Sequence, residues 1–443
     1  MRILVTLTAF LLTVPVEAAT TVKLLHFSDY HSHALPFYSE GRPDQGGIAR
    51  AVDYLRRHKR KGALVFAGGD MINRGAPAWS DKYQCSEWPW LNGIVDAMAF
   101  GNHDADYGFA TFLECRAALH YPILSANTHG LQPYAVFAAK GKRIGVFAIA
   151  GSDFQTLVKV PEMRFGDAVA AARETVRRLR ADEKADAVVL IGHQNAEADY
   201  ELARAVRGID IIFGTHSHRK QGLTRIPGTD TWFISPFQYL TYISEVDLTF
   251  SGSGLAAVNG RLARMDASIA VDQATARQVS RMQEELRRDP QYRDLFIPFA
   301  TTPAAMSAGE LGRYAVETMR TATGADLAIS TTSSFRGALP AGPIDGELLL
   351  AALPYDNQIV VVSVPPASVE KLLELARSAD GAIVVGAGSG PLVSVATTDY
   401  LANVAPLYRD LFAGAPIRST GLRVRQELRK RLETQWPYSA YPP

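Results

Sequence analysis

Short apolar runs alternate with amphipathic stretches along the first half of the chain. The runs end in Gly, Asn, Asp or His, as buried strands do. They are Val22–Phe27, Ala63–Ala67, Ala97–Phe100, Ile123–Ser125, Ile144–Ile149, Ala187–Ile191 and Ile209–Phe213. Between several of them, apolar residues recur at three- and four-residue spacing, which predicts helices over Ile48–Arg60 and Asp167–Ala181. Alternating strands and helices predict a layered α/β fold.

A different pattern begins after about Phe250. Ser251-Gly252-Ser253-Gly254 punctuates the chain, and we expect the strands of the first domain to end before it. The polar stretch Ala274–Arg288 favours a helix and stops at Asp289-Pro290, which is typical of a connector. A second set of apolar runs then predicts further strands and a helix at Leu327–Ile329, Ile359–Val364, Ala367–Ala376, Ile383–Val385 and Leu392–Ala396.

The length of 443 residues suits two domains. We place the larger first domain at residues 19–260, the connector with its helix at 261–298, and a smaller α/β domain at 299–443. Residues 1–18 are predicted to be a signal peptide, because Arg2 precedes the apolar run Ile3–Val14 and small residues surround Ala18. The protein is therefore expected to be exported, to the periplasm or the medium, after cleavage near Ala18.

Composition narrows the range of partners. The chain carries 46 Lys and Arg against 45 Asp and Glu, which provides no strong field for binding duplex nucleic acid. No later run reaches the roughly 20 apolar residues that a membrane-spanning helix needs. The only cysteines, Cys85 and Cys115, could form one disulfide in an oxidising compartment, and the sequence leaves that pairing and the oligomeric state open.

Residues suited to binding metals follow five of the predicted strands. They occur in Asp29-Tyr30-His31, Gly68-Gly69-Asp70, Gly101-Asn102-His103-Asp104, Gly192-His193 and Gly214-Thr215-His216-Ser217-His218. The carboxyl ends of strands open into a common crevice in α/β sheets, so these groups can converge on one point. A single His or Asp at a strand end is usually structural, but five clusters in this order favour a metal centre.

These five clusters together resemble those of the calcineurin-like metallophosphoesterase superfamily. Within it, the Gly-Asn-His-Asp stretch and Leu124-Ser125-Ala126-Asn127 are similar to the secreted 5'-nucleotidase family. The second half continues the resemblance with Thr323-Gly324-Ala325-Asp326, Leu353-Pro354-Tyr355-Asp356-Asn357 and Asp399-Tyr400-Leu401-Ala402-Asn403. The resemblance implies a four-layer metallophosphoesterase domain, with β-sheets flanked by helices, followed by a smaller α/β 5'-nucleotidase-like domain.

The resemblance also implies two divalent metal ions. Asp29, His31 and His218 would hold one ion. Asn102, His193 and His216 would hold the other, and Asp70 would bridge the two. This mixture of carboxylate, amide oxygen and imidazole suits Zn, Mn or Fe better than Ca. A hydroxide between two such cations would attack phosphorus in line with the leaving oxygen, without a nucleophilic side chain.

His103 matches the family position that lies beside the metals. There it would stabilise charge on the phosphoryl group or assist the leaving oxygen. Asp106 matches the carboxylate that would orient this imidazole and favour its charged form, although a turn residue before Tyr107-Gly108 is the alternative. Asp104 is expected only to support the ligands, and His33 to be a cleft or surface residue.

In the related family the second domain supplies the base-binding site. Tyr355 and Tyr400 occupy the positions of two aromatic rings that would sandwich a nucleobase. Two family segments are altered here, because Thr331-Thr332-Ser333-Ser334-Phe335-Arg336 keeps only Arg336 of the usual glycine-rich pattern, and Val404-Ala405-Pro406-Leu407 replaces another glycine-rich stretch. The substrate-binding residues are therefore predicted to be Arg336, Tyr355 and Tyr400.

The function implied is an exported 5'-nucleotidase-like phosphomonoesterase acting on a nucleotide or another small phosphate ester. The same machinery also leaves open a phosphodiesterase, a hydrolase of UDP-sugars or cyclic nucleotides, or a sulfur-ester hydrolase. A non-catalytic exported binding protein is the alternative of another class. The complete ligand set with His103 argues against it, because a decayed enzyme would be expected to lose ligands.

Overall fold

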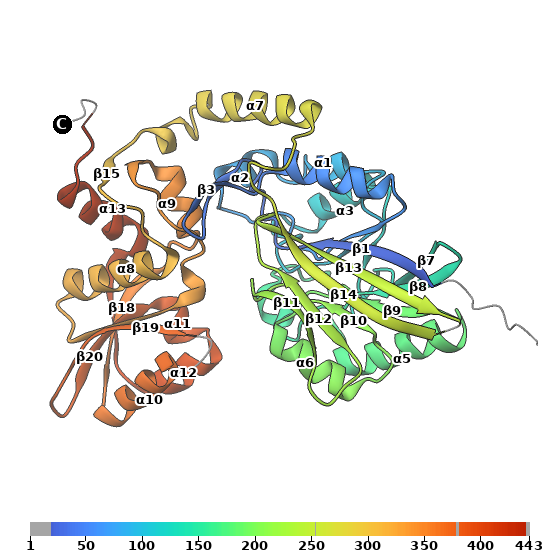
Figure 1. Cartoon of the computed structure of the whole chain (residues 1–443). Coiled ribbons are helices and arrows are strands. Elements are labelled where there is room, and N and C mark those ends of the chain that lie inside the picture. The colour runs from blue at the N-terminus through green and yellow to red at the C-terminus, as the bar shows by residue number, and fades with distance from the viewer. Residues whose placement is uncertain (1–18, 253, 378–380, 440–443) are drawn as a thin grey trace, which may run out of the picture.

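The first domain is built on two stacked β-sheets (Figure 1). The computed structural model describes residues 19–252, 254–377 and 381–439. The first sheet has the strand order β14 (Gly254–Arg264), β13 (Tyr242–Ser251), β1 (Thr20–Phe27), β4 (Leu64–Ala67), β5 (Ala97–Ala99), β6 (Ile123–Leu124). The second has the order β11 (Lys220–Arg225), β12 (Trp232–Pro236), β10 (Ile211–Phe213), β9 (Ala187–Leu190), β8 (Lys142–Phe147), β7 (Tyr134–Ala139).

Apolar side chains fill the space between the two sheets. Val22, Phe66, Val146, Val189 and Phe213 belong to this buried cluster, and each is completely shielded from solvent. Strands that are buried on both faces are uniformly apolar rather than alternating, which is why the sequence shows them as continuous runs.

Helices cover the outer face of each sheet. The face of the first sheet is covered by α1 (Ile48–Lys59), α2 (Ala78–Tyr83), α3 (Phe109–Ala117) and α7 (Gln273–Arg288), and that of the second by α5 (Ala168–Ala181) and α6 (Ala196–Ala205). The order helix, sheet, sheet, helix confirms the expected four-layer architecture. Asp167 caps α5 through the backbone N–H of Ala170, and Asp272 caps α7 through that of Thr275.

Smaller elements complete the first domain. They are the ribbon of β2 (Phe37–Ser39) and β3 (Arg42–Gln45), the short helix α4 (Phe154–Leu157) and the 3-10 turn η1 (Trp88–Leu91). A disulfide joins Cys85 to Cys115, with the two Cα atoms 5.8 Å apart. It ties the segment after α2 to α3, and so resolves the pairing that the sequence left open.

The expectation that the strands end before Ser251-Gly252-Ser253-Gly254 was wrong. Ser251 pairs with Gly254 at the end of a hairpin, and β14 runs back along β13 as far as Arg264. The proposed boundary at residue 260 falls inside this strand. β14 lies at the edge of the sheet and alternates small, polar and charged residues, so it gave no apolar run to detect.

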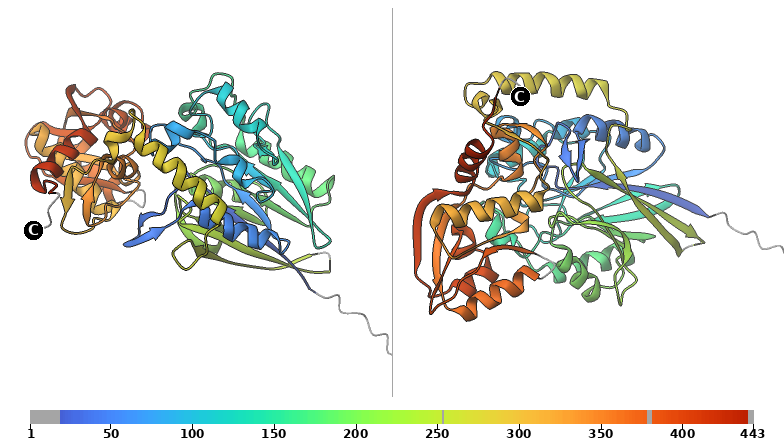
Figure 2. Two further views of the ribbon diagram at one scale, coloured as in Figure 1. Left: turned by 90° about the horizontal axis from the view of Figure 1, so that it is seen from above. Right: turned by 60° about the vertical axis from the view of Figure 1, so that its left-hand side comes forward.

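The connector helix α7 packs on the first domain. Val279, Met282 and Leu286 are buried in the cluster that also contains Tyr54 and Leu55 of α1. Tyr83 of α2 donates a hydrogen bond from its hydroxyl to the Met282 carbonyl oxygen at 2.5 Å. Figure 2 shows α7 running across one side of the molecule from the first domain to the second.

The second domain has one main sheet with helices around it. Its strand order is β19 (Ala382–Gly386), β16 (Leu327–Thr331), β20 (Val393–Thr398), β18 (Gln358–Val364), β21 (Ile417–Arg423). The helices are α8 (Ala308–Thr323), α9 (Gly346–Ala352), α10 (Pro366–Arg377), α11 (Asp399–Asn403), α12 (Pro406–Phe412) and α13 (Val424–Gln435). The ribbon of β15 (Ala300–Thr302) and β17 (Gly342–Ile344) and the 3-10 turns η2 (Arg293–Phe296) and η3 (Thr332–Ser334) complete it.

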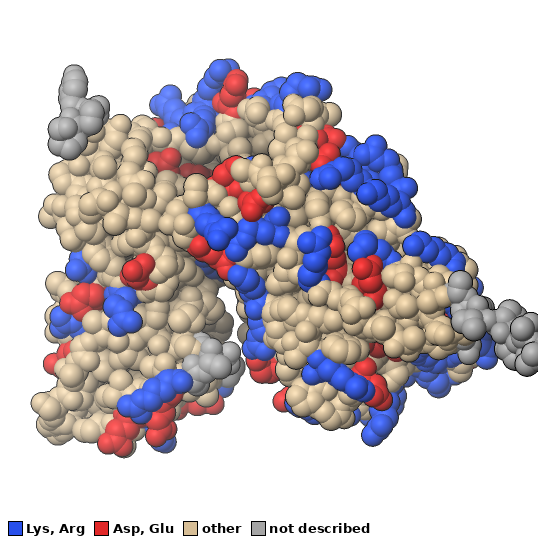
Figure 3. Space-filling model, viewed as in Figure 1, with Lys and Arg blue, Asp and Glu red and all other residues tan. Residues whose placement is uncertain are grey.

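The two domains touch through specific hydrogen bonds. The Ala78 N–H of α2 donates to the Glu347 carboxylate of α9 at 3.2 Å, and the Gln238 side-chain amide donates to the Arg336 carbonyl oxygen at 2.9 Å. The space-filling view shows a hollow between the domains, with acidic and basic side chains interspersed on this face (Figure 3). In the described ranges, none of the helices is long and apolar enough to span a membrane.

Candidate metal centre

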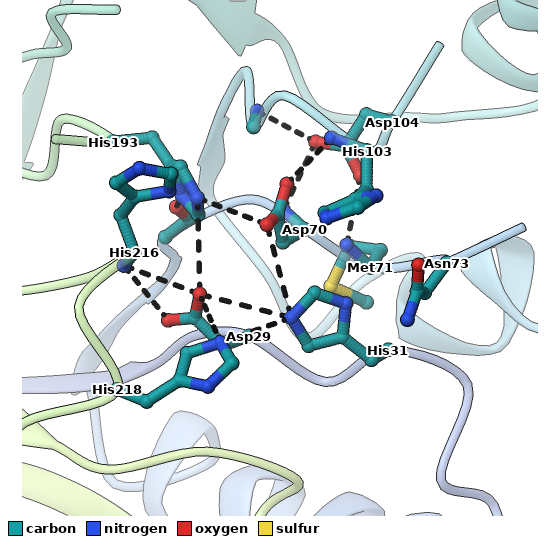
Figure 4. Close-up of polar contacts among 12 residues, drawn as sticks. Asp29, His31, Asp70, Met71, Asn73, His103, Asp104, His193, His216 and His218 are labelled. Carbon is teal, nitrogen blue, oxygen red and sulfur yellow. Dashed lines mark hydrogen bonds and ion pairs between the residues drawn. The ribbon is translucent and has the colours of Figure 1, made fainter. Parts of the chain in front are cut away.

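The side chains predicted to hold metals converge at the carboxyl ends of strands from both sheets (Figure 4). Asp29 and His31 follow β1, Asp70 follows β4, and Asn102 follows β5, all in the first sheet. His193 follows β9, and His216 and His218 follow β10, in the second sheet. The two stacked sheets therefore deliver their loops to one common point.

Three groups of ligand-type atoms form there, each within 4.8 Å. Two of them are Asp29 with His31 and His218, and Asp70 with His193 and His216. The third, His31 with Asp70 and His103, shares His31 with the first and Asp70 with the second. Asp70 also joins the first two groups, because its Oδ2 lies 3.1 Å from His193 Nε2 and 3.7 Å from His31 Nε2. The family resemblance implied two neighbouring ions held by Asp29, His31 and His218 and by Asn102, His193 and His216, and that assignment stays a prediction.

Asn102 completes the predicted set. It is 7% exposed, and its Oδ1 has no hydrogen-bond partner among the described residues. A buried carbonyl oxygen is costly unless it accepts a hydrogen bond or binds a cation. The donor chemistry of the site therefore fits divalent metal ions.

Close backbone approach requires glycine beside these ligands. A Cβ on Gly101 would lie 2.2 Å from the Asp70 backbone nitrogen and 2.3 Å from its Oδ1. Gly69 holds φ at +88°, which side chains disfavour. The loops after β4 and β5 can pack this tightly only with glycines at these positions.

Asp104 fixes the same two loops. Its carboxylate accepts backbone hydrogen bonds from Gly101 at 2.7 Å, Met71 at 2.8 Å and Asp70 at 3.2 Å. Burial raises the pKa of Asp104 to about 7, and the neighbouring charge of Asp70 acts in the same direction. Asp104 thus supports the ligands rather than joining any of the groups, as predicted.

Charge is concentrated and shielded from water in this site. Burial opposes a charged His193, yet the facing carboxylates of Asp70 and Asp29 outweigh it and raise its pKa to about 10. Burial lowers the pKa of His31, and it lowers that of His218 to about 4, helped by the positive charge of Arg336. The last two imidazoles are therefore held neutral, the form that binds metals.

His103 lies at the rim of the cluster. Its Nδ1 is 2.7 Å from Asp106 Oδ2, and its ring centroid is 5.2 Å from that of His31. Burial opposes the charge on His103, but Asp70 and Asp106 raise its pKa overall. Asp106 also accepts the Arg74 backbone N–H at 3.0 Å, so the predicted partner carboxylate is itself anchored.

The second domain presents Arg336 and Tyr355 toward this centre. Arg336 Nη2 donates to the Tyr355 hydroxyl at 2.7 Å, while its Nε and Nη1 are buried with no hydrogen-bond partner in the described part of the chain. The guanidinium acts on the pKa of His31 and His218, which places it close to the first ligand group. Tyr355 and Tyr400 are 36% and 42% exposed, and the Arg336 guanidinium lies over the Tyr355 ring, 5.1 Å from its centroid.

Two residues of the site were not foreseen. Tyr239 stacks on His33 with ring centroids 3.6 Å apart and contacts the His31 ring edge-on at 5.8 Å. Asp153 lies 2.9 Å from His216 Nε2. Asp153 closely follows the strand β8, so the rule used for the other strand ends could have identified it. His33, expected in the cleft or on the surface, is half-buried against Tyr239.

Comparison with known proteins shows which class of protein this chain belongs to. Residues 22–220 match the family model described as calcineurin-like phosphoesterase, and residues 297–409 match that of the 5'-nucleotidase C-terminal domain. The fold, the ligand groups and these matches define a metal-dependent phosphoester hydrolase. Within that class, the chain belongs to the 5'-nucleotidase family of calcineurin-like phosphoesterases.

Individual relatives extend over most of the chain. Protein UshA of Yersinia enterocolitica is 24% identical over 419 residues, covering 80% of this chain and 75% of that protein. A 5'-nucleotidase of Vibrio parahaemolyticus is 25% identical over 413 residues, covering 78% and 73%. The structure of a 5'-nucleotidase precursor from Thermus thermophilus superposes with a TM-score of 0.76 at 20% identity, covering 96% and 98%, and so shares the fold.

Proposed function

We propose that the protein is an exported phosphomonoesterase that releases phosphate from nucleotides with the help of two divalent metal ions. The observation that carries the proposal is that Asp70 lies between two ligand groups, with its Oδ2 3.7 Å from His31 Nε2 and 3.1 Å from His193 Nε2. Beside them, Arg336 has no partner for its Nε and Nη1 among the described residues. Relatives named as 5'-nucleotidases support the nucleotide as substrate.

The proposed metal ligands are the residues of the two groups together with Asn102. Asp29, His31 and His218 would hold one ion, and Asn102, His193 and His216 the other, with Asp70 between them. The mixed oxygen and nitrogen donors favour Zn, Mn or Fe. Two such ions would supply Lewis acidity for an in-line attack by water at phosphorus.

The protein's own groups would bind and polarise the ester. The available donors of Arg336 would bind the phosphoryl oxygens, because a guanidinium suits that planar, charge-assisted geometry. With Nδ1 held by Asp106, His103 would present its Nε2–H to the phosphoryl group or to the leaving oxygen. Tyr355 and Tyr400 would stack on the base.

Export is proposed from the first residues and the disulfide. Residues 1–18, read as a signal peptide, lie outside the described residues. The disulfide between Cys85 and Cys115 supports an oxidising compartment, where such bonds persist. The periplasm or the medium fits this chemistry.

The test is phosphate release from a substrate panel, with and without a chelator. The panel contains nucleoside monophosphates, a cyclic nucleotide, a UDP-sugar, an S-sulfonated thiol and a small aryl phosphate. We expect the highest kcat/KM with nucleoside monophosphates, and loss of turnover on chelation. Preference for the diester, the sugar nucleotide or the sulfur ester would overturn the assignment as a phosphomonoesterase. No turnover of any member would favour a binding protein.

A further inference from the structure

Asp153 contacts a predicted ligand without belonging to any ligand group. Its Oδ2 lies 2.9 Å from His216 Nε2, and the groups of ligand-type atoms do not include it. The loop that carries Asp153 is tied to the end of another ligand strand, because the Gly151 N–H donates to the His193 carbonyl oxygen at 2.9 Å. A Cβ on Gly151 would lie only 2.5 Å from Asp153 Oδ1, so glycine makes room for the carboxylate.

This contact determines which nitrogen of His216 is free. Because Asp153 Oδ2 lies against His216 Nε2, the ring nitrogen that this carboxylate leaves unoccupied is Nδ1. His193 is held in the complementary way, because its Nδ1 lies 2.6 Å from the Gly68 carbonyl oxygen and its Nε2 lies 3.1 Å from Asp70 Oδ2. In both imidazoles one nitrogen is held by a group outside the ligand groups, and the other ring nitrogen is turned away from that contact; in His193 it faces Asp70.

We propose that Asp153 is a positioning residue for one of the two cation sites. It holds the His216 ring so that Nδ1 joins the ligand group of Asp70 and His193, and the inference rests on the proposed function of that group as a metal site. Partners of this kind on metal-binding histidines fix the ring and its tautomer, and removing them typically weakens metal affinity about 10- to 100-fold.

Replacing Asp153 should test the metal site without unfolding the protein, because its side chain is partly exposed. Its side chain is 36% exposed, and its side-chain ion pair is with His216. Surface substitutions of this kind usually change stability little. The adjacent Ser152 is exposed and lies in the same loop, so Ser152→Ala is the matched control.

The experiment is a Mn²⁺ binding isotherm on chelator-treated full-length protein, with free Mn²⁺ followed by electron paramagnetic resonance. The wild type and Ser152→Ala should bind two ions. Asp153→Ala should weaken one site about 10- to 100-fold and leave the other unchanged. Asp153→Asn keeps an acceptor oxygen and should fall between the two, and the Tm of each chelated variant should match that of the wild type.

An Asp153→Ala isotherm identical to that of the wild type overturns the inference. So does an equal weakening of both sites with a lower Tm of the chelated protein, which would mean that Asp153 is merely structural. A wild-type chain that binds fewer than two ions overturns the proposed function, and this inference with it. The wild-type isotherm thus separates the two failures.

Discussion

At the scale of single residues, the candidate ligands are held in an unfavourable backbone conformation. Asp29, His31, Asp70, His216 and His218 have φ between 48° and 56°, in the left-handed region. Such angles cost about 1–3 kcal/mol per residue and persist only where surrounding contacts enforce them. Here they are enforced by hydrogen bonds such as Asp29 N–H to Gly69 O at 3.1 Å and His31 N–H to Asp70 O at 3.0 Å. The backbone thereby aims short side chains at one point.

Asp70 and His31 should behave differently when replaced. Asp70→Asn should weaken both metal sites together, because Asp70 lies between the two ligand groups, whereas His31→Ala should mainly affect one. Elemental analysis after dialysis measures both outcomes. Loss of a single ion in Asp70→Asn would mean that this carboxylate does not bridge.

His103→Ala should lower turnover far more than metal content. His103 groups with His31 and Asp70, but its Nδ1 is held by Asp106 at 2.7 Å, and we expect the ring to act on the phosphoryl group rather than on an ion. Acid–base or charge-stabilising groups are typically worth about 10²- to 10⁴-fold in rate. Parallel measurement of kcat and bound metal checks this. If metal occupancy falls as steeply as kcat, His103 is a ligand instead.

The sequence was most informative about residues in this region, and for a physical reason. Metal chemistry allows few residue types, and strands end where the crevice opens, so Asp29, Asn102 and His218 could be predicted as ligands from residue type and position together. Tyr239 could not, because an aromatic residue in a loop has many possible uses. Its position against His33 depends on the left-handed backbone at Phe237, Tyr239 and Leu240, and no sequence motif predicts that conformation.

At the scale of elements, the strands with an unbroken apolar run were predictable, including the edge strands β6 and β19, whereas polar edge strands were not. β1, β4 and β9 lie between layers, so their apolar runs report burial directly. β11 and β14 lie at sheet edges and are largely polar, so they look like loops in the sequence. The helices α1, α5 and α7 were predicted within a residue or two, because each buries one face and exposes the other.

The disulfide should matter to stability rather than to metal binding. It joins two cysteines that are 30 positions apart in the sequence, and the loop between them carries Asn102, His103 and Asp106. Restricting the unfolded chain by such a loop is worth about 3–4 kcal/mol in the chain-entropy model. Replacing both cysteines by serine should therefore lower the Tm in thermal unfolding, while wild-type metal content is retained. Equal Tm values under oxidising conditions would contradict this role.

At the scale of the whole molecule, the proposed site draws on two domains. The first domain carries the ligand groups, and the second carries the proposed substrate-binding residues Arg336, Tyr355 and Tyr400. A hollow lies between the domains (Figure 3). The Gln238–Arg336 and Ala78–Glu347 hydrogen bonds join the domains beside this region. Recognition of the base and cleavage of the ester are therefore expected to depend on different domains.

Tyr355→Ala and Tyr400→Ala should each raise the KM for nucleotides. A stacked base is worth about 1–3 kcal/mol when the ring is truncated. Hydrolysis of a small aryl phosphate should change little, because that substrate has no base to stack. The measurement is the KM of each variant for a nucleotide and for the aryl phosphate. Equal effects on the two substrates would assign a structural role to the tyrosines.

The central claim is that two metal ions sharing Asp70 are needed for hydrolysis. Its most direct test is to strip the protein with a chelator and add back Mn²⁺ stepwise, measuring bound metal and phosphate release from a nucleoside monophosphate in the same samples. We predict that activity returns only as the second ion binds to each chain. Full activity with one ion per chain, or with none, would contradict the account.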